Sequence, residues 1–394
     1  MGVWRHTPTD KLPIAELFGS TTDCAMQAMI NSRWPWEPNP DSEALLATLR
    51  GERKSTPVQV LEFLVDPEIV TAILGKDLLP PLDHGESKSE MERSIDELIH
   101  FYYSLGMSAF RAKAILDLPF EKILAEDTAE YSRLQRGWVN EQKGVIGSWE
   151  DFDRYPWPSV RDADYGPLEY ALSHLPEGMT AFAKSYGILE QAMFLMGYET
   201  FAYNLYDDPD LIGAIFQKIE EIYIPFNRAL TQLEGVAGLW MGDDMGFRSG
   251  TMVHPDHLRK YVFPLQKKVA DLCHEQGILF LLHSCGNLAT IMDELIDDVG
   301  IDGKHSFEDI IMPVESFVAK FGERISTIGG VDVDLLSRCT KTEIRSRVRA
   351  ILEACVGSGT YVLGSGNSIT NYVPPENFLT MIDECQRFNA EGWS

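Results

Sequence analysis

One histidine and one cysteine in the second half of the chain have the spacing of a metal-ligand pair. His283 and Cys285 directly follow the apolar run 278–282, which predicts a buried strand. Residues two apart on an extended chain point to the same side, so the imidazole and the thiol project together. Thiolate and neutral imidazole are ligands that bind zinc. The spacing therefore favours a metal site, and a packed cysteine beside a hydrogen-bonded histidine is the alternative interpretation.

The residues after this pair affect how readily the thiol of Cys285 ionises. Gly286 and Asn287 turn the chain toward a periodic apolar segment, 288–296, and Asn287 is a candidate N-cap of that helix. A thiol beside a helix N-terminus ionises more readily than a free one. We therefore expect Cys285 to ionise readily.

Other chemically active side chains also come directly after predicted strands. These residues are Asp243, Asp244, His305, Asp332, Ser365 and Asn367. In a barrel of parallel strands the active site forms where the strands end, so these groups are expected to converge on one face. Each also has a structural interpretation by itself, as a turn cap, a helix cap or a hydrogen-bonded core histidine.

Eight strand candidates follow residue 55, and each precedes a helical pattern. They are 58–65, 109–112, 179–183, 236–241, 278–282, 301–304, 325–328 and 361–363. This alternation predicts parallel strands joined by right-handed crossovers. The count and the chain length predict an α/β fold, the closed (β/α)8 TIM barrel. An open doubly wound sheet is the alternative, and no Gly-x-Gly-x-x-Gly fingerprint supports its dinucleotide-binding version.

Two segments differ from this repeat. Residues 1–55 are irregular and turn-rich, and we expect an N-terminal arm that packs on a barrel formed by 56–394. Within the barrel, residues 116–162 are mixed and polar, which predicts an irregular insertion.

Composition restricts the partners and the compartment. With 34 basic and 60 acidic residues, the formal net charge is −26, which disfavours nucleic acid and anionic membranes as general partners. A very anionic substrate would need a local basic pocket. No apolar run approaches the roughly 18 residues of a membrane span, and residues 1–20 lack a signal-peptide pattern. Six cysteines without paired spacing fit a reducing cytoplasm.

Six segments, taken together and in order, resemble the uroporphyrinogen decarboxylase superfamily. They are 147–158, 242–246, 254–255, 280–287, 328–332 and 373–377, which include Gly242-Asp-Asp-Met-Gly and Phe280-Leu-Leu-His-Ser-Cys-Gly-Asn. The resemblance implies the TIM barrel, and a homodimer by analogy. The superfamily contains decarboxylases that act on a porphyrin precursor and methyltransferases that depend on cobalamin, a corrinoid.

This chain resembles the methyltransferase branch more closely. True decarboxylases carry an Arg-rich N-terminal motif and a histidine in the turn after the last strand. Here the N-terminus reads Val3-Trp-Arg-His-Thr-Pro and the last turn reads Gly364-Ser365-Gly366. The methyltransferase resemblance implies zinc held by His283, Cys285 and a third ligand. It also implies a methyl-corrinoid on a partner protein and a small molecule as methyl donor or acceptor.

The resemblance and the spacing together assign the remaining roles. The third zinc ligand of the family is a cysteine in the last turn, where this chain has Ser365 or Gly366, and His305 is the best substitute on spacing. Asp243 and Asp244 are weaker ligand candidates. We predict Asp244 and His305 as catalytic residues. Substrate binding is predicted for Asp243, Asp332, Ser365 and Asn367. The alternative function is a decarboxylase-type lyase, or a tetrapyrrole- or corrinoid-binding protein, without metal.

Overall fold

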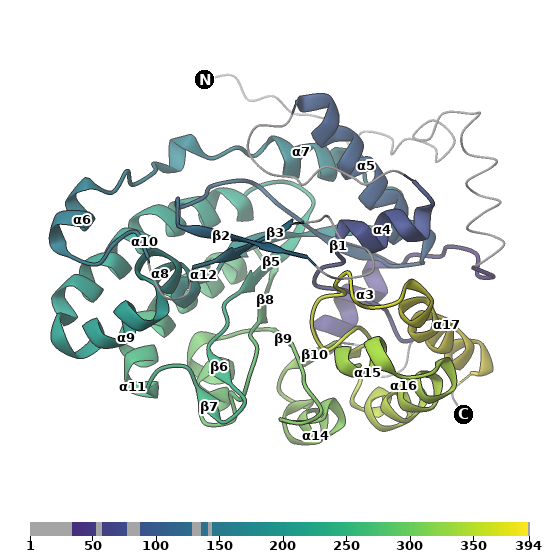
Figure 1. Cartoon of the computed structure of the whole chain (residues 1–394). Helices are drawn as coiled ribbons and strands as arrows, with labels where there is room; N and C mark the ends of the chain where they lie inside the picture. The colour runs from purple at the N-terminus through teal and green to yellow at the C-terminus, as the bar shows by residue number, and fades with distance from the viewer. Residues whose placement is uncertain (1–33, 53–56, 77–86, 128–134, 141–143, 393–394) are drawn as a thin grey trace.

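Seven of the eight predicted strands form one parallel sheet with helices around its outside (Figure 1). The computed structural model describes residues 34–52, 57–76, 87–127, 135–140 and 144–392. The strands in sheet order are β1 (Ala109–Ala112), β4 (Thr180–Tyr186), β5 (Val236–Gly242), β8 (Leu279–His283), β9 (Gly303–His305), β10 (Ser326–Ile328) and β11 (Tyr361–Val362). Every neighbouring pair is parallel, as alternating strands and helices require.

The eighth predicted strand lies beside β11 as an extended segment. Val60 and Val65 form isolated parallel bridges with Leu363 and Ile369. On its other side, the side chain of Gln59 accepts a 2.8 Å hydrogen bond from the Ser108 hydroxyl, just before β1. The segment at 58–65 therefore bridges the two edge strands, and the sheet takes the TIM-barrel-type α/β fold that the sequence predicts.

The long helices follow the strands with few departures from the sequence pattern. Their bounds are α4 (Pro67–Leu74), α5 (Lys88–Ser104), α7 (Gly166–Ser173), α8 (Ile188–Met196), α9 (Tyr198–Asp207), α10 (Pro209–Thr231), α12 (Phe263–Glu275), α14 (Val314–Phe321), α15 (Val333–Arg338), α16 (Lys341–Cys355) and α17 (Pro375–Glu391). A capping box of Thr340 and Glu343 begins α16. Gly197, at φ 75°, separates α8 from α9.

The predicted insertion contains an antiparallel hairpin and a short helix. The hairpin joins β2 (Lys122–Glu126) to β3 (Gln135–Val139), and α6 (Trp149–Arg154) follows. Residues 128–134 and 141–143 of the insertion lie outside the described residues, as do 1–33 and 53–55 of the predicted N-terminal arm. The boundaries of arm, barrel and insertion therefore stay predictions.

One helix of the N-terminal segment closes the end of the barrel at which the strands begin. In α3 (Ser42–Leu49), Leu45 and Leu49 are buried in an apolar cluster with the inward side chains Leu61, Ala109, Phe182, Ala237, Trp240, Leu279, Leu281, Ile328 and Val362. The backbone N–H of Ser42 donates to the Gly178 carbonyl at 2.8 Å, and the hydroxyl of Ser326 donates to the Leu49 carbonyl at 2.7 Å. Both partners lie at strand starts, so α3 forms the floor of the barrel.

Two negative findings concern the described residues alone. None of the helices in this part of the chain combines the length and the apolar character needed to cross a membrane. The five cysteines in the described ranges, at 273, 285, 339, 355 and 385, are free thiols, and Cys24 lies outside these ranges.

Candidate metal centre

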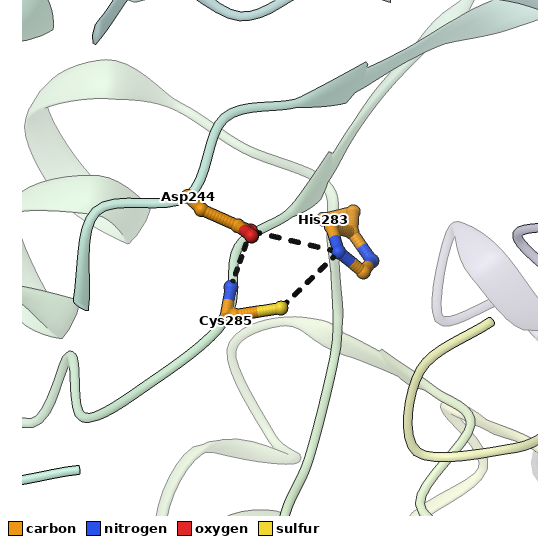
Figure 2. A group of neighbouring side chains, drawn as sticks. All are labelled: Asp244, His283 and Cys285. Carbon is orange, nitrogen blue, oxygen red and sulfur yellow. Dashed lines mark hydrogen bonds and ion pairs between the residues drawn. The ribbon is translucent and has the colours of Figure 1, made fainter. Parts of the chain in front are cut away.

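Three side chains of different chemistry meet where the strands end. Asp244 follows β5, His283 ends β8, and Cys285 follows it by two residues. Their ligand atoms all lie within 4.8 Å of one another, and Figure 2 shows the three groups turned toward a common point. The Nε2 atom of His283 is 3.5 Å from the Cys285 sulfur and 3.6 Å from a carboxylate oxygen of Asp244. The pair that the spacing predicts therefore lies together, and Asp244 completes the group.

Strand register and backbone hydrogen bonds bring these residues together. The parallel ladder pairs Gly242 with His283, so the residues after β5 and β8 are neighbours. The Asp243 N–H donates to the His283 carbonyl at 2.9 Å. The Cys285 N–H then donates to Oδ1 of Asp244 at 2.8 Å. Asp244 is therefore held against the cysteine backbone, with its carboxylate directed at the imidazole.

His305 lies behind His283 and orients its ring. The ladder between β8 and β9 pairs these two residues, and their Nδ1 atoms are 2.7 Å apart. The Nε2 atom of His305 is 3.2 Å from the Ser365 carbonyl, which can only accept, so this nitrogen carries a hydrogen. In a neutral His305 the Nδ1 is then an acceptor, and His283 donates to it from its own Nδ1. The Nε2 lone pair of His283 is left facing Cys285 and Asp244.

Burial keeps both imidazoles neutral. It lowers the pKa of His305 to about 3, and it lowers the pKa of His283 well below the ordinary value, with a further contribution from His305. Neutral imidazole is the form that binds metals. Both nitrogens of His305 are occupied by the protein, so this geometry favours a supporting place for His305 rather than the ligand position that spacing alone predicted.

An aromatic ring fixes the face of His283. Phe63, from the extended segment at 58–65, stacks on the imidazole with ring centroids 4.0 Å apart and an interplanar angle of 11°. Its edge approaches Gly242, where an added Cβ would lie 3.1 Å from Cζ of Phe63. A side chain at position 242 would push the ring toward the histidine, so the glycine leaves room for the stack.

The sulfur of Cys285 accepts hydrogen bonds from two further loops. The hydroxyl of Ser306 donates to it at 3.4 Å and the side-chain amide of Asn367 at 3.2 Å. Burial, followed by the charge of Asp244, nevertheless raises the pKa of the thiol to about 12. The helix expected at 288–296 begins later, at Met292, with α13 (Met292–Glu294), and continues as a π-helical turn, Leu295–Val299. The expectation of ready ionisation is therefore wrong, because burial and a carboxylate surround the thiol and no long helix begins beside it.

This donor set fits a zinc ion. A thiol, an imidazole with a fixed lone pair and a carboxylate supply the S, N and O ligands that zinc uses. A bound cation would also reverse the local effect on Cys285, because a metal deprotonates a coordinating thiol. Three protein ligands would leave a fourth position open, as in catalytic zinc sites.

The loop behind the sulfur contains one strained residue and is held in place by a buried lysine. Ser306 is the single non-glycine residue with positive φ, 86°, among the described residues. The Nζ atom of Lys304 donates to the carbonyls of Ser284, His305 and Ser306, which belong to two neighbouring strand ends. Strained backbone of this kind persists where surrounding contacts fix it, and it clusters at functional sites.

The residues predicted to bind substrate are engaged by the protein. Asp243 is fully buried and accepts hydrogen bonds from the Glu190 N–H and the Gln266 side chain. Asp332 caps α15 and also accepts from the Asp309 N–H. The hydroxyl of Ser365 lies 2.6 Å from Oε2 of Glu62 and 2.5 Å from the Asn367 carbonyl. Asn367 contacts Cys285, as described above. Substrate contact by Asp243, Asp332, Ser365 and Asn367 stays a prediction.

Four charged residues near this centre were missed by sequence reasoning. They are Glu62, Arg111, Lys184 and Glu190. A signal was present for two of them, because Arg111 and Lys184 each follow an inward-facing residue by two positions in an otherwise apolar or small-residue strand. Glu62 lies next to the inward-facing Leu61, and Glu190 lies in the first turn of α8, where an acid also suits the helix dipole.

Comparison with known proteins identifies the family. A family model described as uroporphyrinogen decarboxylase (URO-D) matches residues 143–388. A methylcobamide:CoM methyltransferase MtbA of Methanosarcina mazei is 23% identical over 283 residues, which cover 68% of this chain and 78% of that protein. Its namesake in Methanosarcina acetivorans is 22% identical over 254 residues, covering 62% and 70%.

The solved structures agree on the fold. A methyltransferase from Methanosarcina mazei superposes with a TM-score of 0.65 at 18% identity, covering 88% of this chain and 98% of that one. Among the family's branches, the similarity to curated methyltransferases matches the branch that the sequence resembles. Because the family model covers more than half of its length, the chain belongs to the uroporphyrinogen decarboxylase (URO-D) family.

Proposed function

We propose that this chain is a corrinoid-linked methyltransferase that binds zinc at Asp244, His283 and Cys285. It would move a methyl group between a corrinoid protein and a small molecule, with a thiol as the acceptor. The convergence of three zinc-type ligand atoms within 4.8 Å at the strand ends is the observation that carries the proposal. The relatives named as methylcobamide:CoM methyltransferases support the reaction class.

Each residue of the centre has a distinct part in this proposal. Zinc, when bound, would lower the pKa of a substrate thiol and keep it nucleophilic at neutral pH. His283 offers Nε2 because His305 holds the proton of its Nδ1 in place. Asp244 supplies the third ligand in place of the cysteine that the family resemblance implies in the last turn. Ser306 and Asn367 hold the sulfur of Cys285 by hydrogen bonds.

The proposed methyl transfer needs no reactant besides the thiol and the methyl-corrinoid. The acceptor sulfur forms a bond to the methyl carbon while the carbon–cobalt bond of the corrinoid breaks, and that electron pair stays on cobalt. The thiol proton would pass to solvent as the thiolate forms, before this step. The homodimer, the partner corrinoid protein and the cytoplasmic location stay predictions beside this proposal.

Metal analysis tests the site. We expect one zinc per chain in the native protein and a background level in Cys285→Ala and Asp244→Asn. Cys339→Ala and Asp293→Asn are the matched controls, because both residues lie outside the cluster, and they should keep their zinc. Equal and negligible zinc in the native protein and in Cys285→Ala would remove the metal from the proposal.

A paired assay tests the reaction. Zinc-loaded protein with methylcobalamin and 2-mercaptoethanesulfonate should form the methyl thioether, followed by mass spectrometry and by loss of methylcobalamin absorbance. Uroporphyrinogen, offered to the same protein, should stay unchanged. Formation of coproporphyrinogen instead would support the lyase, and formation of neither product would contradict the proposed reaction.

A further inference from the structure

One lysine is buried on the outer side of the sheet, behind the loops of the metal centre. Lys304 lies in β9 and is 4% exposed. Side chains alternate along a strand, so Lys304 points away from the barrel interior that the next residue, His305, faces. Its Nζ atom lies 4.2 Å from the ring centroid of Phe307 and 5.9 Å from that of Phe317 in α14. The ammonium therefore lies in the apolar layer between the sheet and the outer helices.

This ammonium donates to backbone carbonyls and, among the residues that the structure describes, to no carboxylate. The acceptors are the carbonyls of Ser284, at 3.5 Å, His305, at 3.2 Å, and Ser306. An ammonium carries three hydrogens, so each carbonyl can receive one. A buried charge without a counter-charge in contact is costly, and an apolar side chain would fill the same space at lower cost. Packing alone therefore does not account for a lysine here.

The charge of Lys304 persists in spite of its burial. Burial lowers its pKa to about 8, and the opposing charges of Cys285 and Asp244 limit this fall, so the ammonium is mostly protonated at neutral pH. All three hydrogens are then available to the three carbonyls.

Two of these carbonyls belong to residues that place the sulfur of Cys285. Ser284 lies between the two proposed ligands His283 and Cys285, and its N–H donates to the His305 carbonyl at 3.3 Å. Ser306 donates its hydroxyl to the sulfur at 3.4 Å. Lys304 therefore joins the turn that carries the cysteine to the turn that carries its hydrogen-bond donor.

The turn at Ser306 needs contacts of this kind to keep its shape. Its φ of 86° is unfavourable for a residue with a Cβ, and such backbone persists where the surroundings hold it. The peptide between Ser306 and Phe307 is held on both sides, because its carbonyl accepts from Lys304 and its N–H donates to the Gly366 carbonyl at 2.8 Å. Without the ammonium, this peptide would be free to rotate and to take the Ser306 hydroxyl away from the sulfur.

We propose that Lys304 is a positioning residue of the metal centre, which holds the turns after β8 and β9 in the arrangement that presents Cys285 to the metal. It acts through the carbonyls of Ser284 and Ser306 and touches neither the metal nor the substrate. This proposal rests on the proposed function, because it concerns the zinc site named there.

Cobalt(II) in place of zinc tests the geometry of the centre. The native protein should show the visible bands of a tetrahedral site and a sulfur-to-cobalt charge-transfer band. Lys304→Ala, with its fold checked by circular dichroism, should bind cobalt about 10- to 100-fold more weakly and show altered bands. Lys320→Ala is the control, because this lysine also lies near a phenylalanine ring, that of Phe321, on the exposed side of α14. Native affinity and a native spectrum in Lys304→Ala would overturn the proposal.

Added amines separate hydrogen-bond donation from packing. Lys304→Ala leaves space in the pocket that Ser306, Phe307 and Phe317 also line. Propylammonium should raise the cobalt affinity of this variant several-fold and restore its spectrum, and it should leave the native protein unchanged. Tetramethylammonium has the charge but no N–H, so it should restore neither. Equal restoration by both cations, or by neither, would overturn the role given to the N–H donors.

A double-variant cycle tests the path through Ser306. Ser306→Ala keeps the Cβ and loses the hydroxyl that contacts Cys285, so it should weaken cobalt binding by itself. If Lys304 acts through this residue, then Lys304→Ala should cost less affinity in the Ser306→Ala background than in the native protein. Losses that simply add would overturn the path through Ser306.

Hydrogen exchange in metal-free protein separates this proposal from the proposed function. The N–H of Cys285 donates to Asp244 and that of Phe307 to the Gly366 carbonyl. In chelator-treated Lys304→Ala these two amides should exchange about tenfold or more faster than in native protein, while those of α10 stay unchanged. Faster exchange in a chain whose native form binds no metal would keep the lysine's hold on the turns and reject the zinc. Zinc binding with unchanged exchange would reject the role of Lys304 alone.

Discussion

The Nδ1 atoms of His283 and His305 lie 2.7 Å apart, so these two imidazoles share one proton. The Ser365 carbonyl beyond His305 decides where that proton belongs, because it requires a hydrogen on Nε2 of His305. The proton between the rings is therefore donated by His283. A backbone carbonyl on the last strand's turn thus sets the hydrogen on Nδ1 of His283 and leaves a lone pair on Nε2, which faces the cluster.

Replacing His305 should weaken zinc binding without abolishing it. In His305→Phe the Nδ1–H of His283 loses its acceptor, and we expect zinc affinity to fall by about 10- to 100-fold, as for other groups that orient a metal ligand. His305→Gln offers an amide oxygen to His283 and an amide N–H to Ser365, so it should restore much of the affinity. Competition with a chelating dye measures both variants.

A surface histidine provides the control for this experiment. His274 pairs with Asp302 outside the centre, and His274→Phe should bind zinc like the native protein. Complete loss of zinc in both His305 variants would make His305 a ligand, as its spacing first indicated. Native affinity in His305→Phe would show that the ring of His283 needs no partner.

Glu62 should make stability depend on pH. Burial raises its pKa from 4.5 to about 8. The Ser365 hydroxyl has one hydrogen, and if this goes to the Asn367 carbonyl, then Glu62 must be protonated to donate to Ser365. The folded state therefore binds a proton that the unfolded chain releases, so stability is greatest below about pH 4.5 for this group. It falls as pH rises to about 8 and changes no further above that.

The variant Glu62→Gln should remove this dependence. The amide can accept from the Ser365 N–H and donate to its hydroxyl, as the protonated acid does. We expect its melting temperature relative to the native protein to rise steadily between pH 5 and 8, measured by calorimetry. Glu234→Gln, at an exposed position, should show no such trend. A constant difference for Glu62→Gln across this range would mean that Glu62 is already ionised at pH 5.

Adding one methyl group at Gly242 should disturb the centre. The new Cβ would lie 3.1 Å from Cζ of Phe63, whose ring is stacked on His283, so either the ring or the strand must shift. We expect Gly242→Ala to lose about 1–3 kcal/mol of unfolding free energy and to bind zinc more weakly. Gly250→Ala meets no atom within 4 Å and is the control. Chemical denaturation measures both, and equal stabilities would show that the ring adapts freely.

The thiol of Cys285 should react slowly when no metal is bound. Its pKa is raised to about 12 by burial and by Asp244, so little thiolate exists at pH 8. Asp244→Asn removes the second cause, and we expect several-fold faster alkylation of metal-free protein by iodoacetamide, followed on the Cys285 peptide by mass spectrometry. Cys339→Ala serves as a background without the other intermediate-exposure thiol. Slower alkylation in Asp244→Asn would contradict the assigned charge effect.

Local sequence patterns predicted the positions of the strands and the direction of side chains along them. The eight strand positions follow from apolar runs, and the common direction of His283 and Cys285 follows from their spacing of two. The role of His305 depends on register between β8 and β9, which pairs it with His283, and no local pattern contains that register. Asp243 and Asp244 are adjacent in sequence, yet one is buried against Gln266 and the other faces the cluster.

The two cations inside the barrel could have been placed from the sequence pattern. Arg111 and Lys184 interrupt inward-facing positions of β1 and β4, where apolar side chains fill the lower barrel. Alternation alone places both charges inside. What alternation cannot supply is that Nη1 of Arg111 has no hydrogen-bond partner among the described residues, because that depends on which strands are neighbours in the sheet.

The floor formed by α3 bears on the order in which reactants would bind. In the part of the chain that the structure describes, Leu45 and Leu49 block the lower end, so a reactant would approach Cys285 from the end where the strands finish. Under the proposed function, a bulky methyl carrier and a small acceptor would both use the opening at this end of the barrel. The small molecule would bind first and the carrier would then cover the opening, so each turnover would end with the carrier leaving before the methylated product.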